Sequence, residues 1–394
     1  MLELIAALTR AMPEGPILVG FSGGLDSTVL LHALNALPCA RARGLRALHV
    51  RHDLHPAAAQ WARQCQQTCR DWDIPIEVAR VQVRQDSGLG LEAAAREARH
   101  GAFAAALAPG ETLALAHHRR DQAETVLLRL LRASGSEGLG AMRAMRAIGA
   151  GRLWRPLLDI PPEALAAYAR ARGLEWLEDP SNTDTRFERN FLRHRVLPLL
   201  RERWPQAVAA FARSAALLAE DAMLLADAAH ARLLRARTPD PCTLATPPLL
   251  SLSPAWRTRV LRLWLAQLGL PSPPGRAFAL IDQELLHSRH DAQPEYRWAG
   301  LRLQRWRQLL HVAIAQSVPP RLDCEWSGQS RLELPGGGSL EMLREPADAT
   351  LALPEDFAPL RVLGREGGER IRLPGRRHSH ALKDCLLRSG LPPW

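Results

Sequence analysis

The sequence predicts an α/β protein with a doubly wound, Rossmann-like parallel sheet, then a helical and mixed second domain and a small strand-rich C-terminal domain. Two observations predict this fold class. Short apolar runs alternate with helical apolar patterns through about residue 200. Beyond that point the alternation stops, and proline-rich stretches separate the remaining segments. With 394 residues, the chain is longer than one typical domain.

Five apolar runs predict the strands of the parallel sheet. They are nearly continuous in apolar residues, as is typical of strands buried on both faces. The expected strands are 17–21, 45–50, 76–83, 112–116 and 153–157. The segments between and after them carry helical periodicity, and the expected helices are 27–37, 57–71, 91–107, 121–133, 162–172 and 186–200. Such alternation places ligand sites at the carboxyl ends of the strands.

The remainder of the chain is divided by prolines. An alanine-rich helical segment covers 205–236, and prolines 239, 241, 247 and 248 mark a boundary after it. Helices at 254–269 and 275–287 and strands at 296–303 and 308–313 predict a small mixed domain. Pro319-Pro320 and the glycines at 336–338 lead into the strand-rich piece. The expected domains are 1–204, 205–318 and 319–394.

Composition indicates a cytoplasmic protein without a membrane anchor. Hydrophobic residues make up 47% of the chain, but no apolar run is long enough to cross a bilayer. The N-terminal MLELIAALTRAM contains Glu3 and predicts a short amphipathic helix rather than a signal peptide. The six cysteines are scattered. Only Cys65 and Cys69 lie close, without neighbouring histidines, so we expect reduced thiols.

The formal net charge of +10 indicates a polyanionic partner such as nucleic acid. A compositional bias toward arginine is an alternative explanation, because Lys383 is the only lysine. The position of the arginines must therefore decide between the two interpretations.

The segment ILVGFSGGLDS at 17–27 carries the clearest functional signal. Gly23 and Gly24 allow a sharp turn and a close approach to a ligand. The freed amides, the helix N-terminus and the hydroxyls of Ser22 and Ser27 form an expected pyrophosphate site around Leu25, and Asp26 could hold a magnesium ion. No lysine follows, so this is not a Walker A loop. An ordinary Gly-Gly turn is the alternative.

Two further segments are expected at the same edge of the sheet. His49 ends the second predicted strand, where it could contact adenine, although a surface histidine is an equal alternative. Arg96 and Arg99 follow Glu92 on one predicted helix. Their spacing alone favours a solvated, salt-bridged face, whereas arginine beside a nucleotide would bind phosphate.

Asp121 and Glu124 begin the helix that follows the fourth predicted strand. Their spacing is that of a capping box, which is one explanation. At a strand's carboxyl end, both carboxylates would also project into the cleft and hold magnesium or an ammonium group. Further along, Arg186, Arg189 and Arg193 recur as a basic stripe. A solvated helix face is the usual meaning of such a stripe, but beside a nucleotide site a phosphate-contacting surface is favoured.

Taken together, these motifs resemble the tRNA(Ile)-lysidine synthase family of the PP-loop ATP pyrophosphatase superfamily. The matching segments are SGGLDS at 22–27, LEAAAR at 91–96, HHRRDQAET at 117–125, GLGAM at 138–142, RPLL at 155–158, EDPSNTD at 178–184, RNFLR at 189–193 and the C-terminal GGERIRLPGRRHSHALKDCLLRSGLPPW. SGGLDS alone indicates only the superfamily. The 178–193 segments and the C-terminal segment are far more specific.

The resemblance implies ATP-dependent ligation of free L-lysine to C2 of cytidine 34 in the CAU anticodon of tRNA(Ile). An adenylated cytidine would be the intermediate, and lysidine, AMP and pyrophosphate the products. It implies that the loop at 22–27 holds the pyrophosphate, with Mg²⁺ shared by Asp26. Asp121 and Glu124 would bind or deprotonate the lysine amine, and Arg96 and Arg193 would steady the adenylate. The implied tRNA-binding residues of the C-terminal segment are Arg370, Arg372, Arg376, Arg377 and Lys383.

Three features depart from the family pattern. Arg120 stands where the family usually has a first aspartate before Asp121, and Asp53 stands where it usually has glycine. The sequence ends at Trp394, where relatives usually continue, so we expect an incomplete third domain. A 2-thiolating PP-loop enzyme and a catalytically impaired tRNA-binding homologue are alternative functions. Monomer and homodimer both stay open.

Overall fold

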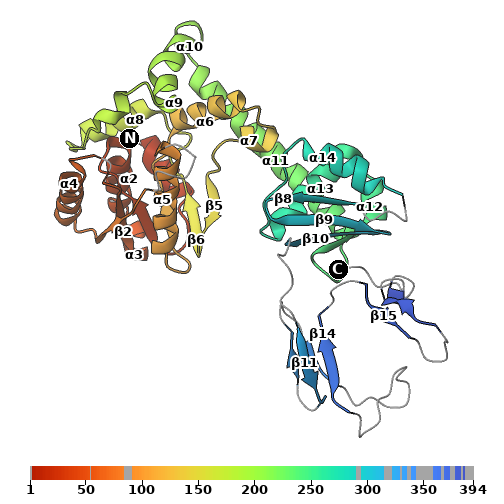
Figure 1. Ribbon diagram of the computed structural model, residues 1–394. Helices are drawn as coiled ribbons and strands as arrows, with labels where there is room; N and C mark the ends of the chain where they lie inside the picture. The colour runs from red at the N-terminus through yellow and green to blue at the C-terminus, as the bar shows by residue number, and fades with distance from the viewer. Residues whose placement is uncertain are drawn as a thin grey trace. The chain divides into compact units, whose positions relative to one another are not determined.

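The computed structural model describes residues 2–53, 55–83, 91–289, 294–314, 322–328, 331–334, 339–342, 358–364, 368–372, 378–382 and 385–386. The chain divides into two compact units, Met1–Leu225 and Ala226–Trp394. The division falls within the long helix α11 (Ala207–Ala236), which lies in the alanine-rich segment that the sequence predicts as helical. Figure 1 shows the elements of both units.

A six-stranded sheet forms the centre of the first unit. Its order is β3-β2-β1-β4-β6-β5, and every neighbouring pair is parallel except β5 with β6. The parallel strands are β1 (Ile17–Gly20), β2 (Leu45–Arg51), β3 (Ile76–Arg80), β4 (Thr112–Ala114) and β6 (Gly151–Trp154). All five predicted strands are confirmed. The sequence missed β5 (Met145–Ile148), because three of its four residues are exposed and produce no apolar run.

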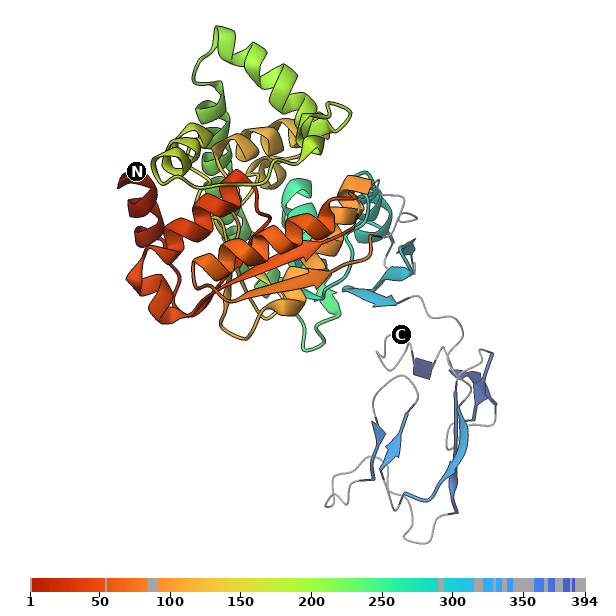
Figure 2. The same ribbon diagram turned by 90° about the vertical axis from the view of Figure 1, so that its left-hand side faces the viewer.

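The sheet is covered on both faces, as a doubly wound fold requires. Alternate residues of β1 enter different hydrophobic cores: Ile17 and Val19 pack with α2, α4 and α8, whereas Leu18 packs with α5. These helices are α2 (Leu25–Asn35), α4 (Ala58–Asp71), α5 (Leu91–Ala106) and α8 (Pro162–Ala171). Figure 1 shows α2, α4 and α5 beside the strands of this sheet, and Figure 2 shows a helix running alongside the strands.

The other helices of this unit follow the prediction in part. The N-terminal segment forms α1 (Leu2–Arg10), with Leu4 and Leu8 buried as an amphipathic helix requires. The remaining helices are α3 (Pro38–Arg43), α6 (Arg119–Leu131) and α7 (Ser136–Leu139). The single helix expected at 186–200 is instead divided into α9 (Glu188–Phe191), a π-helical turn, η2 (Leu192–Val196), and α10 (Leu197–Arg203). A short 3₁₀ turn, η1 (Pro180–Thr183), precedes them.

The second unit contains a small mixed α/β part. Its helical elements after α11 are α12 (Thr246–Leu250), α13 (Pro254–Gln267), α14 (Ala277–Leu280) and η3 (Ile281–Leu286). They pack on an antiparallel sheet of order β7-β10-β9-β8. Its strands are β7 (Thr243–Ala245), β8 (Glu295–Trp298), β9 (Leu301–Trp306) and β10 (Leu309–Ile314). The expected single strand at 296–303 is wrong, because Ala299 and Gly300 turn the chain with φ of 45° and 74°.

Among the described residues from 322 onward there are three antiparallel strand pairs, which confirms a strand-rich C-terminal region. They are β11 (Asp323–Trp326) with β14 (Leu360–Leu363), β12 (Leu332–Glu333) with β13 (Ser339–Leu340), and β15 (Arg370–Ile371) with β16 (His380–Ala381). Of the predicted tRNA-binding residues here, Arg376, Arg377 and Lys383 lie outside the described residues.

The cysteines are free thiols, as expected. Cys65 and Cys69 pack in the core on α4, where burial raises the pKa of each thiol to about 12. Neither is therefore a thiolate at neutral pH. Within the described parts of the chain, no helix has the length and apolar character needed to span a membrane.

Candidate active site

The turn after β1 has the conformation that the Gly-Gly pair predicts. Gly23 has φ of +81°, a left-handed conformation that favours glycine. A β-carbon at this position would lie 2.5 Å from Cδ1 of Leu177 and 2.8 Å from Sγ of Cys65. The amide of Leu177 also donates to the Gly23 carbonyl at 2.8 Å. Gly23 therefore packs against Leu177 and Cys65, whereas its neighbours Ser22 and Gly24 line the cleft.

The two serine hydroxyls brace this turn. Ser27 Oγ donates to the Gly24 carbonyl at 3.0 Å, and the amide of Gly24 donates to Ser22 Oγ at 3.3 Å. The two hydroxyl oxygens are 3.0 Å apart. Gly24 is the N-cap of α2 and offers no side-chain acceptor to the amides of the first turn. A helix N-terminus with this geometry is suited to an anion.

A cleft of about 660 Å³ opens at this turn, at the carboxyl ends of β1, β2 and β4. This is the edge of the sheet where the strand order predicts ligand binding. Nine of the predicted site residues line the cleft: Ser22, Gly24, Leu25, Asp26, Ser27, His49, Arg96, Asp121 and Arg193. Gly23, Glu124, Arg186 and Arg189 are not among the lining residues.

His49 is fixed as a neutral ring in the cleft wall. Its Nδ1 donates to the carbonyl of Phe21 at 3.0 Å, and the side chain is buried. Burial is the main cause of a lowered pKa. The ring therefore presents its other nitrogen, Nε2, as a hydrogen-bond acceptor.

Two cleft histidines that the sequence analysis did not select have buried Nδ1 atoms with no partner among the described residues. They are His52 and His100. Burial, followed by the charges of Arg96 and Arg146, lowers the pKa of His100 to about 4. The signal that could have found His100 is its spacing, because it lies one turn after Arg96 on the same helix.

The two predicted carboxylates, Asp121 and Glu124, both contact the guanidinium of Arg193. Arg193 Nε donates to Glu124 Oε1 at 2.7 Å, and its Nη2 lies 3.1 Å from both Glu124 Oε2 and Asp121 Oδ1. Asp121 lines the cleft, whereas Glu124 is 0% exposed beneath the guanidinium. The expectation that both carboxylates project into the cleft is therefore wrong for Glu124.

Arg193 lies in the π-helical turn η2. Single π turns are frequent at functional sites, because the extra residue redirects a side chain. Burial works against the charge of Arg193, but the hydrogen bond and charge of Glu124 and the charge of Asp121 outweigh it and raise its pKa. The guanidinium therefore stays charged in the cleft.

The predicted capping box exists, but with different partners. His118, not Asp121, is the N-cap of α6: the Asp121 amide donates to His118 Nδ1 at 3.4 Å, and the His118 amide donates to Asp121 Oδ2 at 3.0 Å. His118 Nε2 lies 3.5 Å from Asp26 Oδ2. Burial lowers the pKa of His118, but the hydrogen bond to Asp26 and the charges of Asp121 and Asp26 raise it above its usual value.

His117 and Arg155 form a second buried contact beside Arg96. Arg155 is 4% exposed, and its Nε donates to His117 Nδ1 at 3.2 Å. Burial lowers the pKa of His117 to about 3 and that of Arg155 to about 10. At neutral pH the imidazole is therefore neutral, and its Nε2 carries the proton because Nδ1 accepts.

The structure describes both residues in this region that depart from the family pattern, Arg120 and Asp53. Arg120 lines the cleft with its Nε 3.9 Å from Glu124 Oε1. Asp53 has φ of 48°, where glycine would be unstrained, and it pairs with Arg51 and Arg80. Aspartate tolerates this left-handed conformation better than most residues.

The predicted basic stripe is not one surface. Arg186 pairs with Asp184 at 2.7 Å and is exposed, Arg189 donates to Thr125 Oγ1 at 3.3 Å, and Arg193 is in the cleft.

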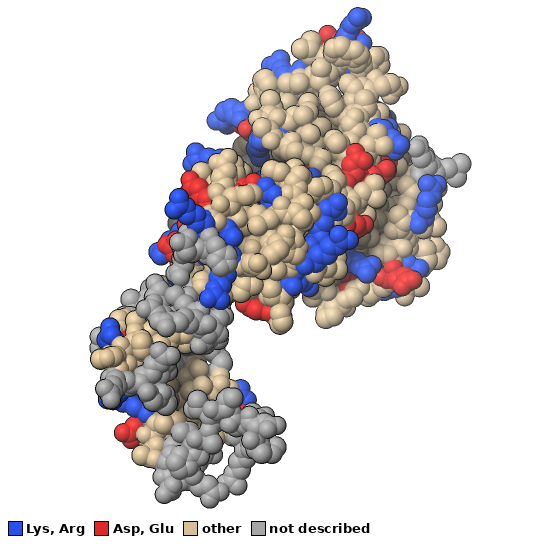
Figure 3. All heavy atoms as spheres, turned by 90° about the vertical axis from the view of Figure 1, so that its right-hand side faces the viewer, with Lys and Arg blue, Asp and Glu red and all other residues tan. Residues whose placement is uncertain are grey.

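Arg370, in β15, donates to Ser379 Oγ at 2.9 Å and to the Ser379 carbonyl at 2.6 Å. Figure 3 shows basic side chains distributed across one face of the molecule.

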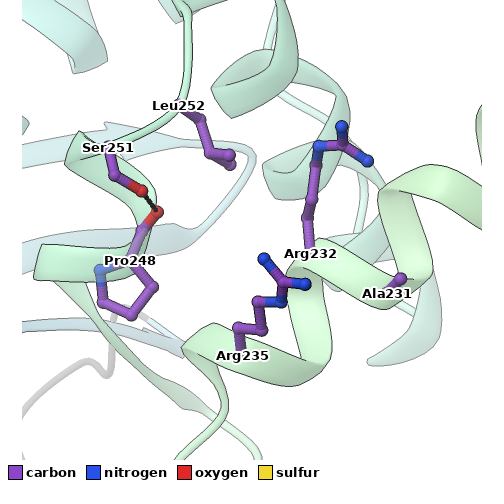
Figure 4. A pocket seen from close by; sticks show the side chains of 6 residues that line it. All are labelled: Ala231, Arg232, Arg235, Pro248, Ser251 and Leu252. Atoms are coloured by element: carbon purple, nitrogen blue, oxygen red, sulfur yellow. Dashed lines mark hydrogen bonds between the residues drawn. The ribbon is translucent and has the colours of Figure 1, made fainter.

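The second unit has a smaller pocket of about 340 Å³, lined by Ala231, Arg232, Arg235, Pro248, Ser251 and Leu252 (Figure 4). Arg232 donates to the Ala228 carbonyl at 2.8 Å and lies 3.9 Å over the ring of Trp256. Arg235 lies in the last turn of α11, where a cation interacts favourably with the helix dipole. Local contacts therefore explain both arginines, and the lining includes no carboxylate or histidine.

Comparison with known proteins identifies the family. Residues 2–200 match the PP-loop domain, and residues 244–311 match the TilS substrate binding domain. The tRNA(Ile)-lysidine synthase of Xanthomonas campestris is 50% identical over 99% of this chain and 88% of its own length. The enzymes of Xylella fastidiosa and Serratia proteamaculans are 48% and 41% identical, over 97% and 100% of this chain and 86% and 89% of their own lengths. The chain therefore belongs to the tRNA(Ile)-lysidine synthase family.

Proposed function

We propose that this protein ligates L-lysine to C2 of cytidine 34 in tRNA(Ile) with a CAU anticodon, at the expense of ATP. The observation that carries the proposal is that one cleft contains both the SGGLDS turn and the Arg193–Asp121 pair. Such a ligation needs a turn that binds the leaving pyrophosphate and a carboxylate that binds the incoming amine. The family relationship agrees with this assignment.

ATP would bind with its phosphates at the turn. The first-turn amides of α2 and the hydroxyls of Ser22 and Ser27 suit the leaving pyrophosphate. His49, a neutral acceptor in the cleft wall, would face the nucleoside. Arg96 would contact the α-phosphate, since a guanidinium binds phosphate oxygens in pairs.

A magnesium ion fits this site in one way. Among the described residues no group of three metal-ligating side chains occurs, so protein groups alone would not enclose the ion. Magnesium commonly uses one or two carboxylates together with substrate phosphates. Asp26 lines the cleft at the turn and would be that carboxylate. When bound, the ion would offset charge on the phosphate oxygens.

The chemistry would proceed in two steps. In the first, O2 of the cytidine attacks the α-phosphorus of ATP, and pyrophosphate leaves. In the second, the neutral ε-amine of lysine attacks C2, and AMP leaves with the oxygen. Asp121 is the carboxylate that lines the cleft, and it would orient the amine or accept its proton, with the fully buried Glu124 behind it. Arg193 would steady the adenylate phosphate.

The tRNA would contact basic residues in both units. Arg186 is exposed and lies three residues after Thr183, which lines the cleft, and Arg370 is exposed in β15. Arg189, Arg376, Arg377 and Lys383 complete the proposed set. In this proposal, residues 1–204 form the catalytic domain. Residues 205–318 form a domain that interacts with tRNA, and residues 319–394 form a further tRNA-binding domain.

Purified full-length chain tests the proposal directly. With ATP, magnesium and a tRNA(Ile) transcript bearing CAU, it should incorporate labelled lysine and release AMP in equal amounts. A transcript with cytidine 34 replaced by uridine is the control and should accept none. Absence of lysine from the first transcript would contradict the function.

The alternatives give different results. A 2-thiolating enzyme usually needs reactive cysteines, and Cys65 and Cys69 are buried thiols with pKa values near 12. A catalytically impaired homologue would bind the transcript without releasing AMP. The lysine assay therefore separates the ligase from both alternatives, and a measurement of transcript binding without AMP release identifies the impaired homologue.

A further inference from the structure

His118 is an unusual residue for the beginning of a helix. Serine, threonine, aspartate and asparagine are the common N-caps, because their short side chains accept one backbone amide. His118 fills this role on α6 and is only 1% exposed. A histidine ring has a second nitrogen, and a cap alone does not need it.

The second nitrogen points toward Asp26, which lines the cleft. Nδ1 accepts the Asp121 amide at 3.4 Å, and Nε2 lies 3.5 Å from Asp26 Oδ2. Because Nδ1 accepts, the proton of a neutral ring is on Nε2 and points to Asp26. The ring therefore spans the first turns of α2 and α6, which follow the neighbouring parallel strands β1 and β4.

This ring joins the two halves of the site. Asp26 belongs to the proposed ATP side, and Asp121, with Arg193 and Glu124, belongs to the proposed lysine side. The chain of contacts is continuous from Asp26 through His118 and Asp121 to Arg193. A shift of α2 relative to α6 would stretch this chain at the imidazole.

We propose that His118 is a positioning residue that fixes Asp26 relative to Asp121, and so sets the approach of the lysine amine to the adenylated base. The inference rests on the proposed ligation. His118 touches neither substrate in this role and acts through the two carboxylates. Its effect should appear in the second step, where an amine must reach C2 in a fixed orientation.

Serine at this position separates capping from bridging. His118→Ser restores a favourable N-cap but cannot reach Asp26, whereas His118→Ala removes both contacts. His118→Gln keeps a long side chain with a donor for Asp26. His230→Ser is the control, because His230 is an exposed histidine on α11 that contacts Gln267.

The full-length variants are compared by thermal unfolding, by formation of adenylated tRNA without lysine, and by single-turnover transfer of lysine. For His118→Ser we expect a thermal midpoint near that of the wild type. Lysine transfer should fall about 10- to 100-fold, as when an outer partner of an active-site ligand is lost. The KM values for ATP and lysine should change much less than kcat. His118→Gln should recover part of the rate, and His118→Ala should also unfold at lower temperature.

The inference is overturned if His118→Ser transfers lysine at a rate close to that of His230→Ser. It is also overturned if the loss of lysine transfer in the Ser, Gln and Ala variants follows their loss of thermal stability, because the role is then structural only. Failure of the proposed function looks different: the wild type and His230→Ser would themselves transfer no lysine.

Discussion

At the residue scale, the cleft combines charged and neutral groups whose states follow from burial. Arg193 keeps its charge because Glu124 and Asp121 compensate it. His117, by contrast, is held neutral by burial, with a pKa of about 3. The sequence predicted Asp26 and Asp121 from motifs that follow strands, and Arg193 from a recurring basic stripe. It did not predict that Arg193 covers Glu124, because the arginine is far away in the chain and reaches the carboxylate from a π turn.

Asp26→Ala should abolish turnover and leave tRNA affinity nearly intact. The carboxylate is proposed to hold the ion that offsets phosphate charge, and losing that effect should slow AMP release by about 100-fold or more. AMP release and filter binding of tRNA measure the two properties. Asp71→Ala, at the exposed end of α4, is the matched control. Equal loss of activity and affinity in Asp26→Ala would contradict the assignment.

Arg193→Met should destabilise the first unit, because Glu124 is fully buried and would lose its cation. Removing one partner of a buried ion pair costs about 3–5 kcal/mol. Urea unfolding measures the change. The double variant Arg193→Met with Glu124→Gln should recover part of this stability, since no unpaired carboxylate remains. An equally unstable double variant would show that the arginine acts through packing alone.

At the element scale, the strand-turn-helix unit at the N-terminus was predictable, because apolar runs, glycines and helical periodicity occur in the required order. The antiparallel strand β5 was not, since its residues are mostly exposed and its place depends on pairing with β6. The hairpin at Ala299-Gly300 was missed for a related reason: the apolar pattern continues through the turn. The fold of the π turn depends on contacts with α6, which local sequence does not contain.

Gly23→Ala should weaken both folding and ATP binding. The added methyl would meet Leu177 and Cys65 in a backbone conformation with positive φ. We expect a loss of about 1–3 kcal/mol in the free energy of unfolding. Gly173→Ala is the control, because Gly173 also has positive φ but open space around it. Equal effects of the two substitutions would mean that backbone strain, not the contact with Leu177, makes glycine necessary at 23.

Glu111→Gln should reduce stability in a pH-dependent way. Arg46 donates to both carboxylate oxygens of this buried residue, at 2.7 and 2.6 Å, and the Ala108 amide donates to Oε2 at 3.0 Å. Burial raises the pKa of Glu111, but these bonds outweigh it and lower the pKa. The stabilisation is therefore present above the pKa of the unfolded chain and is lost as the pH falls through the folded value.

At pH 7 the loss should be about 1.5–3 kcal/mol, the usual range for hydrogen bonds to a charged group. Below about pH 4 the stabilities of wild type and variant should converge. Urea unfolding at several pH values checks both statements. A difference that stayed constant between pH 7 and pH 3 would show that the charge of Glu111 is not the cause.

At the scale of the whole molecule, arginine is nearly the only source of positive charge, and arginine and lysine together exceed the acidic residues by ten. The net charge alone could not locate a tRNA surface. Several arginines form ion pairs within the fold: Arg46 with Glu111, Arg257 with Asp282 and Arg361 with Asp323. The positions of the arginines in the fold therefore say more about a tRNA-binding surface than their number does.

Binding of tRNA should weaken steeply as salt rises, because each phosphate contact releases counterions. Between 50 and 200 mM salt we expect about a 100-fold loss of affinity or more. Arg370→Ala should reduce the slope by about one, whereas the exposed Arg276→Ala serves as control. Fluorescence anisotropy with labelled transcript measures the slope. A flat response to salt would remove the electrostatic basis for the proposed surface.

The contact of Arg193 with Asp121 and Glu124 has one more consequence. Before any amine arrives, the acidic pocket already holds a cation of its own, so a free diamine must displace the guanidinium to reach Glu124. Its apparent affinity is lowered by the free energy of that internal pair. The same free-energy cost applies to every amine that competes with Arg193 for these two carboxylates.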